Sequence, residues 1–224
     1  MAKRPELERD ARQFAAEITS LINSTVGHGI RLGAALTQSR AACIVGYGVT
    51  QRNQEVQRIP CTLGAAPATC WLYAAHAFVL DAVGHLTSAS TSYAVYADDD
   101  PDSEPLVHYD YNRNPSNSYP EAHVQVVADS SVFRTLRKNC GLDEGTQLGH
   151  LHFPVGGRRF RPSLEDVIEF LIVEGFAEGR PDWKIAVEQS RRNFYEKQLR
   201  AAIRREKELV LEAVRDLDAT DGWL

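Results

Sequence analysis

The fold class of this chain is indicated by four segments in its middle: TCWLYAAHAFVLDAV (69–83), TSYAVYAD (91–98), LVHYDYN (106–112) and EAHVQVVAD (121–129). Each segment is rich in aliphatic and aromatic residues, and Gly, Pro, Asn, Asp or Ser residues separate it from the next, which is typical of strands and turns. The connections are too short for the helical crossovers that parallel strands need. We therefore predict an antiparallel meander in the middle of the chain.

Three further strand-like segments precede this region, at 30–36, 42–50 and 56–63, and a candidate final hairpin, HLHF and RRFR, follows at 150–161. Apolar residues recur at helical spacing over 5–23, 131–138, 163–174 and 182–218, and Ser163 is a good N-cap. The sequence predicts an α+β fold with an N-terminal helix, a mostly antiparallel meander sheet of about six to eight strands and long C-terminal helices.

The domain organisation follows from the Gly- and Pro-containing break near residue 179. We interpret residues 1–178 as an α+β sheet domain with its N-terminal helix, and residues 179–224 as a C-terminal helical extension. The extension has an apolar stripe and a densely charged face, so it is expected to pack on the sheet domain. The alternative is that the stripe binds a partner protein.

Composition indicates an ordinary globular protein. With 224 residues, of which 43% are hydrophobic and 25% charged, the chain is long enough to bury a core without disulfides or a structural metal. The four cysteines, at 43, 61, 70 and 140, form no CxxC pair and show no zinc-ligand spacing. They are expected to be reduced core residues.

The N-terminal segment is charged and helical in pattern, without the apolar stretch of a secretory signal. The longest apolar run, 70–80, contains His76 and is shorter than the roughly 20 residues that cross a bilayer. We therefore expect a cytoplasmic protein that does not bind membranes. A net charge of −5 argues against a surface that is basic all over, as in general duplex-DNA binders.

The histidines of the predicted sheet are the residues that point to chemistry. Strand alternation places His123 and Gln125 on one face, and it places His150 and His152 together on one face of a later strand. If these strands lie close together, their imidazoles converge.

The segment LVHYDYN adds Asp110 and His108 on one face and Tyr109 and Tyr111 on the other. Arginines follow the second histidine strand at Arg158, Arg159 and Arg161.

These residue types fit metal-independent phosphodiester chemistry, because imidazole exchanges protons near neutral pH and guanidinium groups stabilise phosphate charge. In this hypothesis His123 is a general acid or base, and His150 or His152 is its complement. Arg159 or Arg161 binds the phosphate. Asp110 completes the catalytic group, and Arg158 and Tyr109 join the substrate-binding group.

Two other interpretations stay open. In the first, each histidine is a structural residue whose nitrogens are satisfied by neighbouring carbonyls. A metal site is the other, since His150 and His152 with Asp110 or His123 offer nitrogen and oxygen ligands as in cupin-like barrels. A Pro-Val-Gly-Gly segment stands where a cupin-like glutamate is expected. The preferred interpretation has no metal and no cofactor.

Four short segments, SYAVYADDD (92–100), LVHYDY (106–111), NPSNSYPEAHVQV (114–126) and RPSLEDVIEFL (161–171), resemble the TumE family of toxins from bacterial toxin-antitoxin pairs. Tyr109 and Asp110 match a Tyr-Asp pair of that family, although His108 stands where arginine is usual. Pro120 and His123 match its histidine element. Gln125 stands where a second histidine is usual.

The resemblance covers roughly residues 91–171, and it implies a small cytosolic growth inhibitor that acts on RNA or translation and is neutralised by an antitoxin. Together with the histidines, it leads to the hypothesis of a toxin-antitoxin or phage-defence effector that acts on RNA or a nucleotide phosphodiester, as a metal-independent ribonuclease or phosphodiesterase-like hydrolase. The alternative is a non-catalytic protein that binds a partner protein through its C-terminal helices. The sequence does not predict an oligomeric state.

Overall fold

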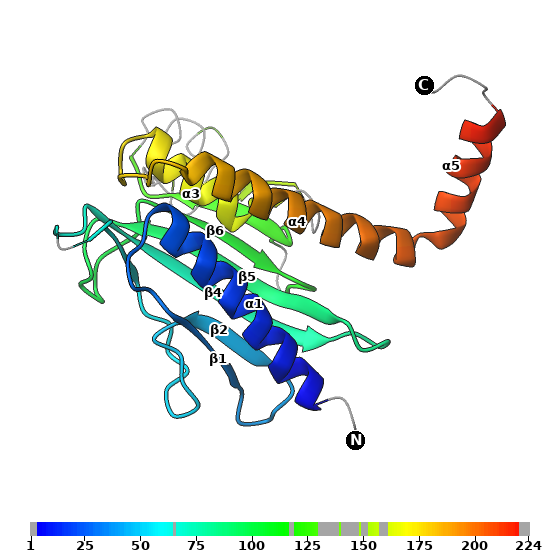
Figure 1. Cartoon of the computed structure of the whole chain (residues 1–224), viewed down its shortest axis with the longest axis horizontal. Helices are drawn as coiled ribbons and strands as arrows, with labels where there is room; N and C mark the ends of the chain where they lie inside the picture. Colours follow the sequence, from blue (N-terminus) through cyan, green and yellow to red (C-terminus); the bar gives the residue numbers. More distant parts are fainter. Residues whose placement is uncertain are drawn as a thin grey trace.

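The computed structural model describes residues 4–64, 66–116, 119–129, 139, 148, 152–156 and 161–219. These residues form helices and one antiparallel sheet, joined by loops (Figure 1). The strands are β1 Leu32–Leu36, β2 Cys43–Tyr47, β3 Ile59–Cys61, β4 Cys70–Leu80, β5 Leu86–Tyr96, β6 Val107–Asn112, β7 Ala122–Val126 and β8 Phe153–Pro154. The helices are α1 Arg4–Thr25, α3 Leu164–Val173, α4 Trp183–Arg205 and α5 Lys207–Ala219. The predicted α+β fold is confirmed.

The strand order is β1-β2-β4-β5-β6-β7-β8, and every recorded pairing is antiparallel. From β4 to β7 each strand pairs with the next one in the chain, which confirms the predicted meander. Strand β3 is outside this strand order. It pairs with β4 on a part of β4 that does not pair with β2. The predicted helix over 131–138 and the RRF part of the final hairpin lie outside the described residues.

Strand β5 begins at Leu86, five residues before the predicted start at 91. The added segment, Leu86–Ser90, carries the weak strand formers Ser and Ala, so its sequence gave little signal. It is a strand because β4 extends to Leu80 and pairs with it. The Asp81 carboxylate closes the hairpin by accepting hydrogen bonds from the amides of Val83 and His85.

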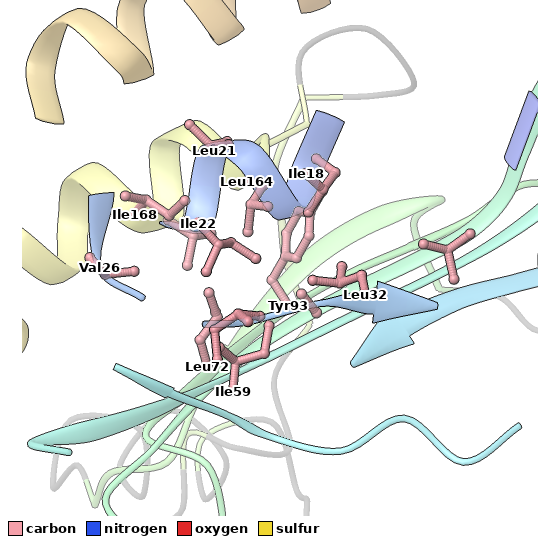
Figure 2. Close-up of a cluster of buried hydrophobic side chains, with 14 of the residues drawn as sticks. Ile18, Leu21, Ile22, Val26, Leu32, Ile59, Leu72, Tyr93, Leu164 and Ile168 are labelled. Carbon is pink, nitrogen blue, oxygen red and sulfur yellow. The ribbon is translucent and has the colours of Figure 1, made fainter. Parts of the chain in front are cut away.

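The core lies between one face of the sheet and the helices α1 and α3 (Figure 2). Ile22 of α1 and Ile168 of α3 point toward Leu72 of β4, and all three are fully buried. The apolar residues of α1 recur every three or four positions, so the helix buries a continuous stripe along the sheet. We call this side of the sheet the helix face and the opposite side the distal face.

Of the two C-terminal helices, α4 contacts the sheet domain through its first part. Val187 of α4 is in the core, Arg191 pairs with Asp166 at 3.1 Å, and Lys197 pairs with Glu17 of α1 at 2.6 Å. Beyond that point α4 runs past the sheet, and α5 turns away from it (Figure 1). Among the described helices, none has the length and apolar character to span a membrane.

The start of α3 has the capping geometry that its sequence predicts. The Ser163 hydroxyl accepts a hydrogen bond from the Asp166 amide, and the Asp166 carboxylate accepts one from the Ser163 amide at 2.8 Å. Since these contacts satisfy amides that the helix leaves unpaired, Ser163→Ala is expected to lower the free energy of unfolding by about 1 kcal/mol. Urea unfolding followed by circular dichroism measures this change. An unchanged midpoint would contradict the role of the cap.

Candidate functional site

Asp110 and two histidines share the distal face of the sheet. In the β6–β7 register Asp110 lies opposite His123, and His108 lies opposite Gln125. The next residues along β6, Tyr109 and Tyr111, point to the helix face, since side chains alternate along a strand. The distal face therefore collects Asp110, His108, His123 and Gln125 from two neighbouring strands.

The Asp110 carboxylate lies between the two imidazoles. Its Oδ2 is 3.7 Å from Nε2 of His108 and 3.9 Å from Nε2 of His123. The side chain of Asp110 is 35% exposed and that of His123 is 11% exposed, so solvent reaches the carboxylate while His123 is largely buried. One carboxylate oxygen thus faces Nε2 of both imidazoles.

The hydrogen bond at Nδ1 fixes the tautomer of neutral His123. Nδ1 is 3.2 Å from the carbonyl oxygen of Pro120, which only accepts hydrogen bonds. Nδ1 therefore carries the proton, and Nε2, directed toward Asp110, holds the lone pair. His123 thus presents an unprotonated nitrogen on the side of the Asp110 carboxylate.

His108 is held differently. Its Nε2 is 2.6 Å from Oε1 of Gln125, the residue opposite it on β7. With Nε2 donating to this amide oxygen, the nitrogen that faces Asp110 is already engaged. Between the two histidines, His123 has the better-placed nitrogen for taking up a proton.

His152 joins this group from the segment just before β8. Its ring stacks on Tyr119 with centroids 3.6 Å apart and planes 15° apart, and its centroid is 4.7 Å from that of His123. β8 pairs with β7 so that Pro154 lies opposite His123. The structure therefore brings together three of the predicted catalytic residues, Asp110, His123 and His152. His150 lies outside the described residues.

Not all of the predicted substrate-binding residues lie near Asp110, His123 and His152. Arg161 lies on the helix face, where its guanidinium carbon is 4.1 Å from the centre of the Tyr111 ring. Tyr109 is also on that face, and burial together with the nearby Asp166 carboxylate raises its pKa. The sheet thus separates Tyr109 and Arg161 from Asp110 and His123. Arg158 and Arg159 lie outside the described residues.

Three further residues lie at the site although they were not predicted as site residues: His108, Gln125 and Tyr119. His108 is two residues before Asp110, so strand alternation already placed both on one face. Gln125 and Tyr119 acquire their roles from the β6–β7 register and from the position of His152. No feature of their own sequence neighbourhood indicates those contacts.

Within the described ranges, no group of three or more His, Cys, Asp and Glu side chains has an arrangement that could hold a metal ion. No protein-family model, curated protein or solved structure matches the chain. The resemblance to TumE-family toxins therefore stays a prediction.

Proposed function

We propose that this chain is a cytoplasmic effector of the toxin-antitoxin or phage-defence type that cleaves a phosphodiester bond in RNA or in a nucleotide. The observation that carries the proposal is His123, whose Nδ1 is fixed by the Pro120 carbonyl while its Nε2 points toward Asp110. The His152 ring next to it supplies a second imidazole. Two imidazoles are sufficient for metal-independent acid-base cleavage of a phosphodiester.

In the proposed reaction, Nε2 of His123 takes the proton from the attacking hydroxyl as the new P–O bond forms. The Asp110 carboxylate stabilises the resulting imidazolium. A protonated His152 gives its proton to the departing oxygen as the old P–O bond breaks. Stacking on Tyr119 orients the His152 ring for this role. Arg158 and Arg159, which follow β8 in the sequence, are the arginines proposed for the phosphate.

Expression in a bacterial host tests the biological part of the proposal. The wild type is expected to slow growth, whereas His123→Ala, His152→Ala and Asp110→Asn are expected to allow normal growth at equal protein levels. His85→Ala is the matched control, because His85 is exposed in the β4–β5 hairpin away from this group. Equal growth with the wild type and the three site variants would remove the effector claim.

Cleavage by the purified protein tests the chemistry. His123→Ala is expected to lower the rate by about a hundredfold, the lower end of what general acid-base catalysis contributes. Parallel substrates, a single-stranded RNA and a cyclic dinucleotide, distinguish a ribonuclease from a nucleotide phosphodiesterase. The His85→Ala protein should match the wild type. Equal rates for wild type and His123→Ala would show that this group is not catalytic.

A second candidate, a non-catalytic interaction protein, is favoured by the exposed apolar residues of the C-terminal helices. Tyr195, Leu199 and Ile203 of α4 are exposed, as are Leu211 and Val214 of α5. Removing both helices would also remove Val187 from the core, so surface substitutions on the helices are the cleaner test.

A further inference from the structure

We call the second half of α4 and the whole of α5, residues 191–219, the arm. Arg191 and Lys197 still contact α3 and α1, and beyond Lys197 the arm projects from the sheet domain (Figure 1). On α4, Tyr195, Leu199 and Ile203 follow one another at four-residue spacing, which places them in one stripe. On α5, Leu211 and Val214 lie three residues apart on one face. Each half of the arm therefore carries an exposed apolar stripe.

The two halves of the arm have opposite charge. Between residues 191 and 205 the charged side chains are Arg191, Arg192, Lys197, Arg200, Arg204 and Arg205, with Glu196 as the only acid. Between residues 206 and 218 the acids are Glu206, Glu208, Glu212, Asp216 and Asp218, with Lys207 and Arg215 as the only bases. An apolar stripe with basic neighbours is thus followed by an apolar stripe with acidic neighbours.

Several of these charges are available for a partner. Arg192, Arg200 and Arg204 are exposed and make no ion pair with any other residue that the structure describes. The same holds for Glu208 and Glu212 within the described ranges. Lys197, by contrast, is engaged with Glu17 of α1, so the side of α4 next to α1 is already occupied.

We infer that the arm binds a second copy of this chain, with α5 of each copy packed on the second half of α4 of the other. This interaction is independent of the proposed chemistry. Both helical segments are about 20 Å long, so they match in length. In a twofold dimer each contact occurs twice, and each pairs a basic α4 with an acidic α5. Both apolar stripes are then covered, which removes the exposed patch.

Charge reversal provides the test. One variant carries Arg200→Glu and Arg204→Glu, and the other carries Glu208→Lys and Glu212→Lys. Each variant alone brings like charges together at both contacts of the dimer. In an equimolar mixture of the two, each acidic α4 meets a basic α5 and each basic α4 meets an acidic α5. Opposite charges therefore face one another at both contacts again.

Analytical ultracentrifugation of the full chain, at low and high micromolar concentration, gives the readout. The wild type is expected to be a dimer, and each variant alone to dissociate with at least a tenfold weaker dimer constant. Their equimolar mixture is expected to be dimeric again. Arg31→Glu with Arg52→Glu is the matched control for the Arg200→Glu and Arg204→Glu variant, because both arginines are exposed outside the arm and the change in net charge is the same as in that variant.

Three outcomes would overturn the inference. A wild type that is monomeric at every concentration would show that the arm is covered by its own chain or by a different protein. A dimer that neither reversal weakens would place the interface elsewhere. Two monomeric variants whose mixture stays monomeric would exclude the exchange of α5 between copies. Higher salt should weaken the wild-type dimer, since the charge pairs are screened.

Discussion

Leu72→Ala is expected to lower the free energy of unfolding by about 3–5 kcal/mol, the largest change of stability that we predict. Leu72 is fully buried in β4 and lies in the cluster formed with Ile22 and Ile168 (Figure 2). Its strand pairs with β3 on one side and with β5 on the other, at Ile59 and Val95. The substitution therefore leaves a cavity between two strand pairings and two helices, where the surrounding side chains cannot easily move to fill it.

Urea unfolding followed by circular dichroism and by tryptophan fluorescence measures this loss. Ile185→Ala is the matched control, because it removes the same number of atoms from a side chain that is 68% exposed on α4, outside the arm. That control is expected to stay within about 0.5 kcal/mol of the wild type. Similar losses for the two variants would mean that Leu72 is not central to the core.

The fold was predictable where apolar residues recur with a clear period. β4 alternates buried and half-buried side chains over its whole length, and α1 carries a regular apolar stripe. The start of β5 was missed because the segment from Leu86 to Ser90 is a strand only through its pairing with β4. Its residues carry little strand preference of their own, so tertiary pairing outweighed local propensity.

The sequence predicted which face of its strand each site residue occupies, but not how neighbouring strands are aligned with one another. Alternation alone placed Asp110 on one face of its strand, and the histidine pattern singled out His123 and His152. Asp110 lies opposite His123 because of the β6–β7 register. A slip of one residue would place the side chains of one strand on the other face of the sheet and separate the two.

The position of Arg161 shows the other limit of the sequence argument. It was grouped with Arg158 and Arg159 because the three are close in the chain. However, Arg161 is two residues before Ser163, the cap of α3, and α3 packs on the helix face of the sheet. Its guanidinium therefore lies over Tyr111, on the side opposite His123. Residues that are close in the sequence therefore need not lie close together in space where the chain passes from one face of the sheet to the other.

Acid is expected to destabilise the protein through His76, a buried residue of β4. His76 is 4% exposed, and its ring packs edge-on against Phe14 and Tyr93 and is stacked with Phe78. Its Nε2 has no hydrogen-bond partner among the described residues. Burial, together with the positive charge of Arg161, lowers its pKa to about 3. The folded protein therefore keeps this imidazole neutral over a wide range of pH.

The direction of the pH effect follows from the two states of His76. In the unfolded chain an imidazole takes up its proton near pH 6.5, whereas in the folded protein it does so only near pH 3. Between these values the unfolded state binds more protons, so stability is full above about pH 6.5 and falls as the pH decreases. This difference amounts to about 2 kcal/mol between pH 6.5 and pH 5, since each pH unit is worth about 1.4 kcal/mol.

The comparison with His76→Phe isolates this contribution, because phenylalanine has a ring of similar shape and no titrating group. Urea unfolding of both proteins is measured at pH 7, 6 and 5, where most exposed carboxylates stay ionised in both states. Whichever protein is more stable at pH 7, the wild type is expected to lose about 2 kcal/mol more than the variant by pH 5. Parallel pH profiles would show that the imidazole is already protonated in the folded core, with Nε2 bound to a group that the fold must then supply.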